Sequence, residues 1–80
     1  MERNELLIQI NTIFRDILDN EDVVVEESTT ANDVEEWDSL THIQLVVAIE
    51  KYFKIRFTSI EIQSWKNVRE MLDCIQNREI

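Results

Sequence analysis

Ser39 and His42 are the two side chains in this sequence whose chemistry and spacing first suggest catalysis. Residues three apart are neighbours on one face of a helix, and a serine beside a histidine is the arrangement of a nucleophile and its base. A hydrolase also needs a third group that orients the histidine and a glycine-built turn that binds the oxyanion, and this sequence has no glycine. We therefore do not expect an enzyme, and we expect His42 to be a partly exposed surface residue.

Histidine and cysteine are too few in this sequence to form a metal site by themselves. His42 is the single histidine and Cys74 the single cysteine, so a zinc site would depend on carboxylates for its remaining ligands. The acidic segment 21–37 also lacks the Asp-x-Asp-x-Asp-Gly spacing of a dedicated calcium loop. We expect no metal site, and we expect Cys74 to be a small buried hydrophobic residue rather than a reactive thiol.

The helix that begins at Ser39 determines where this hydroxyl lies. Asp38 and Ser39 are both strong N-terminal helix caps, and the apolar-rich segment after them predicts a helix through about Phe53. At about 100° per residue, the apolar side chains of this helix fall on two faces. One face holds Leu40, Ile43 and Val47, and the roughly opposite face holds Leu45, Ile49 and Tyr52. A helix that is apolar on two faces needs two surfaces to bury against.

Three other helices are expected around this one. Apolar residues at three-and-four spacing predict a first helix over residues 2–18, which should end near Asp19 and Asn20 because asparagine tolerates the left-handed conformation. Thr58 and Glu61 form a capping pattern that predicts a short helical turn after them. Asn67 is the expected cap of the last helix.

Residues 21–37 show no helical period and are expected to form a long loop between the first helix and the helix of Ser39. A loop of this length is unusual in a compact domain unless it packs or functions. We therefore expect Val24 or Val25, together with Val34, to attach it to the core. A short strand at residues 23–25 is possible, but the sequence offers no second strand to pair with it.

The composition favours a single all-α domain. Eighty residues can build one hydrophobic core and not two, so residues 1–80 are expected to form one domain. Glycine and proline are both absent, which disfavours tight hairpins and phosphate-binding loops and leaves helices joined by Asn- and Asp-containing turns. We predict a four-helix bundle with three longer helices and one short helix.

Negative charge is concentrated in the first half of the chain. Residues 1–40 carry 12 acidic and 2 basic side chains and residues 41–80 carry 5 and 6, which gives the net charge of −9. This negative field disfavours nucleic acid and anionic membranes as partners, and it would steer a basic partner surface toward the first half of the chain. The alternative is that the acidic residues only keep a small protein soluble. The sequence has no long apolar run and cannot form an internal disulfide, so we expect no membrane span and a cytoplasmic location.

Asp38, Ser39 and Leu40 stand in a distinctive sequence context. They follow a long first helix and a long acidic loop, and they precede the apolar-rich residues 48–53, a short turn and a final helix. This order and spacing resemble the acyl carrier proteins over nearly the whole chain. The apolar positions that share the register of that family are Ile43, Val46, Val47, Ile49 and Phe53.

The resemblance implies that Ser39 is the attachment point of phosphopantetheine, which a separate phosphopantetheinyl transferase would take from coenzyme A. The terminal thiol of that arm would carry an acyl group as a thioester, and Asp38 would belong to the motif and cap the helix. A phosphodiester on Ser39 would lie at a helix N-terminus, where free N–H groups and the helix dipole favour negative charge. The implied function is that of a stand-alone, monomeric acyl carrier in fatty-acid or polyketide biosynthesis.

The resemblance also implies a surface for partner enzymes, namely an acyl-loading ligase or acyltransferase and the downstream enzymes that use the acyl group. The residues expected to contact them are Leu40, Ile43, Val47, Glu50 and Trp37, with charge steering the encounter and apolar side chains anchoring it. Core packing is the alternative role for Leu40, Ile43 and Val47, and folding over the loop is the alternative for Trp37. The opposite face of the helix would close the bundle and can border an apolar cargo pocket.

Several features depart from the family pattern. Second helices in the family are usually strongly acidic on their exposed face, whereas this one retains Glu50 and otherwise has Thr41, His42, Gln44 and Lys51, which predicts a different choice of partner. Lys54 stands where glycine is frequent, so that turn must strain or rearrange. With Arg56 it forms a small basic patch, which could touch the prosthetic phosphate or an acidic group of a partner.

Two other functions are compatible with the sequence. The chain could carry aminoacyl or peptidyl groups of a specialised pathway, loaded by an adenylating ligase. It could also be a helical interaction module that has the fold and no prosthetic group.

Overall fold

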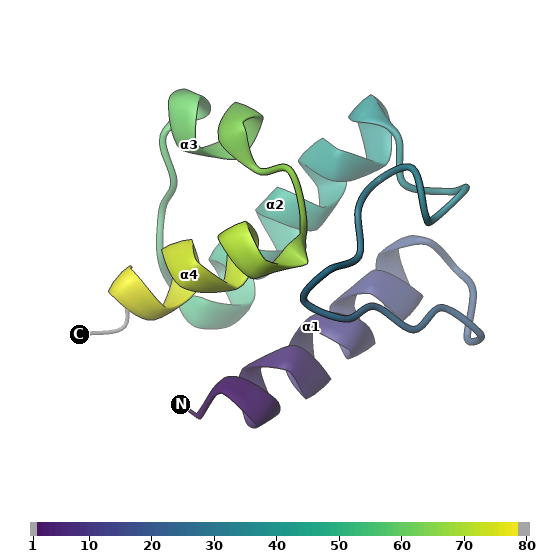
Figure 1. The fold of residues 1–80 in the computed structure, drawn as a ribbon. Coiled ribbons are helices and arrows are strands. Elements are labelled where there is room, and N and C mark those ends of the chain that lie inside the picture. The colour runs from purple at the N-terminus through teal and green to yellow at the C-terminus, as the bar shows by residue number, and fades with distance from the viewer. Residues whose placement is uncertain (1, 79–80) are drawn as a thin grey trace.

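A computed structural model describes residues 2–78 of the chain as four α-helices joined by loops (Figure 1). The helices are α1 (Arg3–Ile17), α2 (Ser39–Phe53), α3 (Ser59–Ser64) and α4 (Val68–Arg78). The predicted all-α bundle with one short helix and a long loop before the second helix is therefore confirmed. The possible strand at residues 23–25 does not form, and residues 2–78 contain no strand.

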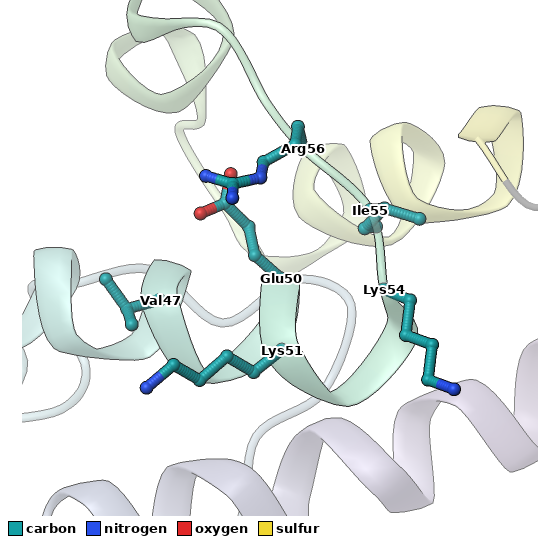
Figure 2. A pocket seen from close by; sticks show the side chains of 6 residues that line it. All are labelled: Val47, Glu50, Lys51, Lys54, Ile55 and Arg56. Carbon is teal, nitrogen blue, oxygen red and sulfur yellow. The ribbon is translucent and has the colours of Figure 1, made fainter.

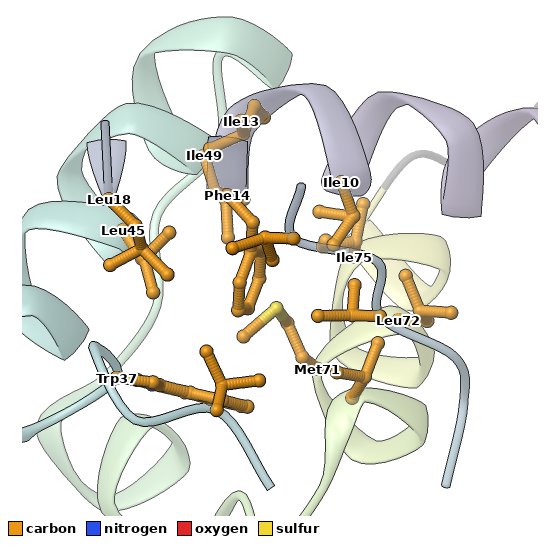
Figure 3. Packing of buried hydrophobic residues seen from close by; sticks show 14 of the residues in the cluster. Ile10, Ile13, Phe14, Leu18, Trp37, Leu45, Ile49, Met71, Leu72 and Ile75 are labelled. Atoms are coloured by element: carbon orange, nitrogen blue, oxygen red, sulfur yellow. The ribbon is translucent and has the colours of Figure 1, made fainter. Parts of the chain in front are cut away.

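The core is built from the apolar stripes of α1, α2 and α4 together with residues of the first loop (Figure 3). Side chains that are fully buried come from all three of these helices: Leu6, Ile10, Phe14, Leu45, Ile49, Val68, Met71, Leu72 and Ile75. Helix α3 contributes no buried residue. Three helices thus form the body of the bundle, and α3 lies on its outside.

The end of α1 lies close to the expected position, but a different residue makes the turn. The helix ends at Ile17 with Leu18 as its C-cap, and Asp19 rather than Asn20 takes the left-handed conformation, with a φ of 51°. A short aspartate side chain tolerates this region nearly as well as asparagine does. The Asn20 side chain instead accepts a hydrogen bond from the Asp22 N–H and donates one to Glu36 at 2.6 Å, which fixes the start of the loop.

The long loop is attached to α1 by a buried amide. Asn11 Nδ2 donates to the Val25 carbonyl at 3.0 Å, and Asn11 Oδ1 accepts from the Val25 N–H at 2.7 Å. Val23, Val25 and Val34 are buried and Val24 is 66% exposed. The predicted attachment by Val24 or Val25 together with Val34 is confirmed, with Val25 as the buried one of the pair, because side chains along this extended segment alternate between core and solvent.

A second attachment joins the loop to the start of α4 and to α1. The loop carbonyls of Thr29 and Glu27 accept the N–H groups of Val68 and Arg69, both at 2.9 Å. Arg3 binds Glu27 at 2.7 Å and Asp73 at 2.8 Å. Burial lowers the pKa of Arg3, but its hydrogen bonds to these two carboxylates outweigh that effect and raise this pKa above its ordinary value. The loop is therefore held at both α1 and α4.

Candidate functional site

Ser39 is the first residue of α2, and its side chain is exposed. Asp38 caps the helix, because its Oδ1 accepts from the N–H groups of Leu40 at 3.0 Å and Thr41 at 2.9 Å. Thr41 Oγ1 in turn accepts from the Asp38 N–H at 2.8 Å, which completes a capping box. The hydrogen bond from the Thr41 N–H is the main reason why the pKa of Asp38 lies below its ordinary value. The predicted helix start and the Asp38 cap are both confirmed.

His42 does not act as a base for Ser39 in this arrangement. Trp37 Nε1–H donates to His42 Nδ1 at 3.0 Å, and His42 Nε2 lies 3.2 Å from the carbonyl of Ile62. Because an indole nitrogen can only donate, Nδ1 accepts and the proton is on Nε2, which donates to Ile62. Both ring nitrogens are therefore used in a bridge from the loop to α3. His42 is half-buried and not simply a surface residue, and the sequence gives no local sign of this bridge, whose partners lie 5 and 20 residues away.

Ser39 lies at the edge of a groove of about 420 Å³ between the loop, α2 and α3, which we call the Ser39 groove. Its wall includes the rings of Trp37, His42 and Trp65, and the His42 and Trp65 rings meet edge to face at 5.9 Å. The remaining lining residues are Ala31, Asp38, Ile43, Ile62, Gln63 and Lys66. An apolar, partly aromatic surface thus lies directly beside the exposed hydroxyl.

Trp37 is part of the interior and not of the outer surface. It is 6% exposed, and its ring meets that of Phe14 edge to face at 5.0 Å (Figure 3). Little of Trp37 is left for the predicted contact with partner enzymes, because the ring is covered by the core and its N–H is held by His42. The ring packs against Phe14 of α1 and stacks on His42 of α2.

The outward face of α2 carries a stripe of exposed apolar side chains. Leu40, Ile43 and Val47 are 68, 53 and 43% exposed, whereas Leu45 and Ile49 are fully buried. The core-packing alternative for the first three residues is therefore wrong, and we call them the exposed stripe.

Tyr52 and Glu50 make contacts on this helix that the sequence did not predict. Tyr52 was placed with the buried residues by its helical position, yet it is 53% exposed and its hydroxyl donates to Gln9 Oε1 at 2.7 Å. Glu50 accepts from the Phe57 N–H at 2.9 Å and is half-buried. Its carboxylate therefore holds the connection between α2 and α3. This structural role was not predicted in addition to the expected partner contact.

Comparison with known proteins identifies the family of this chain. Residues 9–75 match the family described as "Phosphopantetheine attachment site". The chain belongs to the acyl carrier protein family.

Individual relatives agree with this assignment. An acyl carrier protein of Thermosynechococcus vestitus is 32% identical over 79 residues, which are 98% of this chain and 96% of the relative. An acyl carrier protein of Coprothermobacter proteolyticus is 28% identical over 78 residues, with 96 and 94% covered. The solution structure of a holo acyl carrier protein from Geobacter metallireducens superposes with a TM-score of 0.85 at 37% identity, covering 91% of this chain and 84% of that one. These comparisons confirm the predicted carrier function and the predicted covalent phosphopantetheine group at the level of the family.

The residues of this carrier around Ser39 fit such a group. The Ser39 hydroxyl is exposed and makes no hydrogen bond to another residue within 2–78. It lies at the positive end of the dipole of a 15-residue helix, where a phosphodiester is stabilised. Lys66, which was not among the predicted site residues, lines the same groove and adds a positive charge beside the attachment position.

Other candidate chemistry in this acyl carrier has a structural explanation. Cys74 is half-buried and its Sγ accepts the Trp65 Nε1–H at 3.1 Å. Within the described residues, no group of three His, Cys, Asp or Glu side chains could hold a metal ion. In the same part of the chain, no helix has the length and apolar character needed to cross a membrane.

Proposed function

We propose that Ser39 is the residue that carries the phosphopantetheine arm, and that the chain delivers acyl thioesters to separate enzymes. The observation that carries this proposal is the exposed Ser39 hydroxyl at the capped start of α2, beside an apolar groove. When bound, the group would supply a thiol that holds the acyl chain as a thioester. The chain itself supplies the position of the hydroxyl and the apolar surface next to it.

The proton of the Ser39 hydroxyl has to be removed by the transferase in this proposal. Both nitrogens of His42 are engaged, by Trp37 and by Ile62, so this histidine is not placed to act as the base of the serine. This supports a chain without catalysis of its own. Its partners are then a phosphopantetheinyl transferase, an acyl-loading ligase or acyltransferase, and the enzymes that consume the acyl group. We propose that the carrier and these enzymes act in the cytoplasm.

Intact mass measurement after incubation with coenzyme A and a broad-specificity phosphopantetheinyl transferase tests the assignment. We expect one added phosphopantetheine on the wild-type chain and none on Ser39→Ala. Ser59→Ala is the matched control, because Ser59 is also an exposed first residue of a helix but does not line the Ser39 groove. We expect this control to be modified as fully as the wild type. An unmodified wild-type chain, or modification of Ser39→Ala, would contradict the proposal.

A further inference from the structure

A second groove lies at the opposite end of α2 from Ser39. It has a volume of about 440 Å³ and is lined by Val47, Glu50, Lys51, Lys54, Ile55 and Arg56, and we call it the cationic groove (Figure 2). Lys54 ends α2 in the left-handed conformation, with a φ of 58°, which turns the chain so that the residues after it form one wall. The lining of this groove thus combines three basic residues and one acidic residue with the apolar Val47 and Ile55.

The positive charges of the cationic groove are not used to stabilise the fold. Within residues 2–78, the side chains of Lys51, Lys54 and Arg56 form no hydrogen bond or ion pair. The other four arginines are all engaged by protein groups: Arg3, Arg15, Arg69 and Arg78. Figure 2 shows Arg56 extending toward Glu50, whose carboxylate accepts the Phe57 N–H, so the two lysines are the least compensated charges.

The cationic groove is continuous with the exposed stripe that leads to Ser39. Val47 belongs to both, and Leu40 at the other end of the stripe follows Ser39 directly. At 1.5 Å per residue, Ser39 and Lys51 are about 18 Å apart along α2. A partner surface in contact with the stripe near Ser39 would therefore also reach the cationic groove.

We propose that the cationic groove binds an acidic patch on the enzymes that act on the group attached to Ser39, while the exposed stripe packs against apolar residues next to that patch. The proposal rests on the proposed function and adds the charge of the partner surface. A site for a small anion would need only the basic residues. Here Val47 belongs both to the cationic groove and to the exposed apolar stripe, so charged and apolar surface adjoin. Protein interfaces combine apolar anchor residues with a polar or charged rim in this way. A basic patch on the partner would then contact only the acidic loop at the Ser39 end of α2. Because the two ends of α2 carry opposite charge, the two patches of the partner fix the orientation of the complex.

The test uses two synthetic amphipathic helical peptides with the same leucine stripe, one with four glutamates at one end and the other with four lysines. Each is titrated into the ¹⁵N-labelled full chain at low salt and followed by NMR. We expect the glutamate peptide to bind more tightly and to shift the amide signals of Val47, Lys51 and Ile55. Lys51→Glu should weaken its binding about threefold and Lys51→Glu/Lys54→Glu roughly tenfold, since each exposed pair changes from attraction to repulsion.

Arg69→Glu is the matched control, because it makes the same charge change at an exposed cation on α4, outside both the cationic groove and the Ser39 groove. We expect it to leave the affinity for the glutamate peptide within twofold of the wild type. Equal or tighter binding of the lysine peptide, or no effect of Lys51→Glu, would overturn the proposal. So would sodium phosphate that displaces the glutamate peptide at equal ionic strength, because the groove would then be a small-anion site. Peptide binding needs no group on Ser39, so these results are independent of the mass measurement that tests the attachment.

Discussion

The loop on one side of Ser39 and the helix α3 on its other side are held by different kinds of contact. The loop is attached through buried groups, with Val25 bound at both its N–H and its carbonyl by Asn11 and its side chain 1% exposed. Helix α3 has no buried residue, and its described links to the rest of the chain are the His42–Ile62 bridge and the Glu61–Arg78 ion pair. We infer that the loop side of Ser39 is firmly attached to the core, whereas the α3 wall of the Ser39 groove is held by fewer and less buried contacts.

The largest effect is expected when the attachment of the loop is removed. Asn11→Ala leaves both backbone groups of Val25 without their partner in the interior, and an unsatisfied buried group costs about 1–3 kcal/mol. We expect the free energy of unfolding in urea to fall by about 2–3 kcal/mol. Asn4→Ala, at an exposed position of the same helix, should change it by less than about 0.5 kcal/mol. Equal effects of the two variants would show that the buried amide does not hold the loop.

A smaller effect is expected from the bridge to α3. His42→Ala leaves the indole N–H of the buried Trp37 without its acceptor and Ile62 without its donor, so we expect a loss of about 1–2 kcal/mol. The Trp37 indole proton signal should also move to the position of a free N–H. Gln44→Ala, an exposed change on the same helix, serves as the control. An unchanged indole signal in His42→Ala would mean that the bridge is absent in solution.

The Asp38 cap should give a pH-dependent effect of a few degrees. The pKa of Asp38 in the folded chain lies below its ordinary value of 3.8, so the ionised cap stabilises the fold above that pH and this stabilisation is lost as the pH falls through the folded pKa. We expect Asp38→Ala to lower Tm by about 4–8 °C at pH 7. The difference from the wild type should shrink below about pH 4, a trend that calorimetry across pH measures. Glu35→Ala, which removes an exposed charge without a cap, should shift Tm by less than about 2 °C.

The smallest effect is expected at the end of α2. Lys54 adopts a φ of 58°, which costs a residue with a Cβ atom about 1–2 kcal/mol and agrees with the strain predicted for a lysine in place of glycine. Lys54→Gly should therefore raise the free energy of unfolding by about 0.5–1 kcal/mol after the greater freedom of glycine in the unfolded chain is subtracted. Lys54→Ala removes the same charge and keeps the Cβ atom, so no such gain is expected from it in urea denaturation.

Local signals in the sequence were sufficient to predict the helices and the position of Ser39. The caps at Asp38, Thr58 and Asn67 act within three residues of themselves, and each forms as expected. The apolar spacing also separated the exposed stripe from the buried face of α2, apart from Tyr52. Its hydroxyl binds a residue 43 positions away, a contact that no local pattern specifies.

The polar groups that attach the loop and α3 could not be predicted in the same way. Asn11 interrupts an apolar stripe and carries no local sign of its partner Val25, 14 residues away. His42 attracted notice because of its neighbour Ser39, whereas its hydrogen bonds go to Trp37 and Ile62. Such contacts depend on where the folded chain brings distant backbone and ring atoms together.

Amide hydrogen exchange measured residue by residue tests the contrast between the two sides of Ser39 most directly. The Val25 N–H, bound to Asn11, should exchange among the slowest amides, near the rate set by global unfolding. The Ile62 N–H, which closes a turn of α3 on the Thr58 carbonyl, should exchange roughly a hundredfold faster through local opening. Equal protection of these two amides would contradict the account, because α3 would then be held as firmly as the loop.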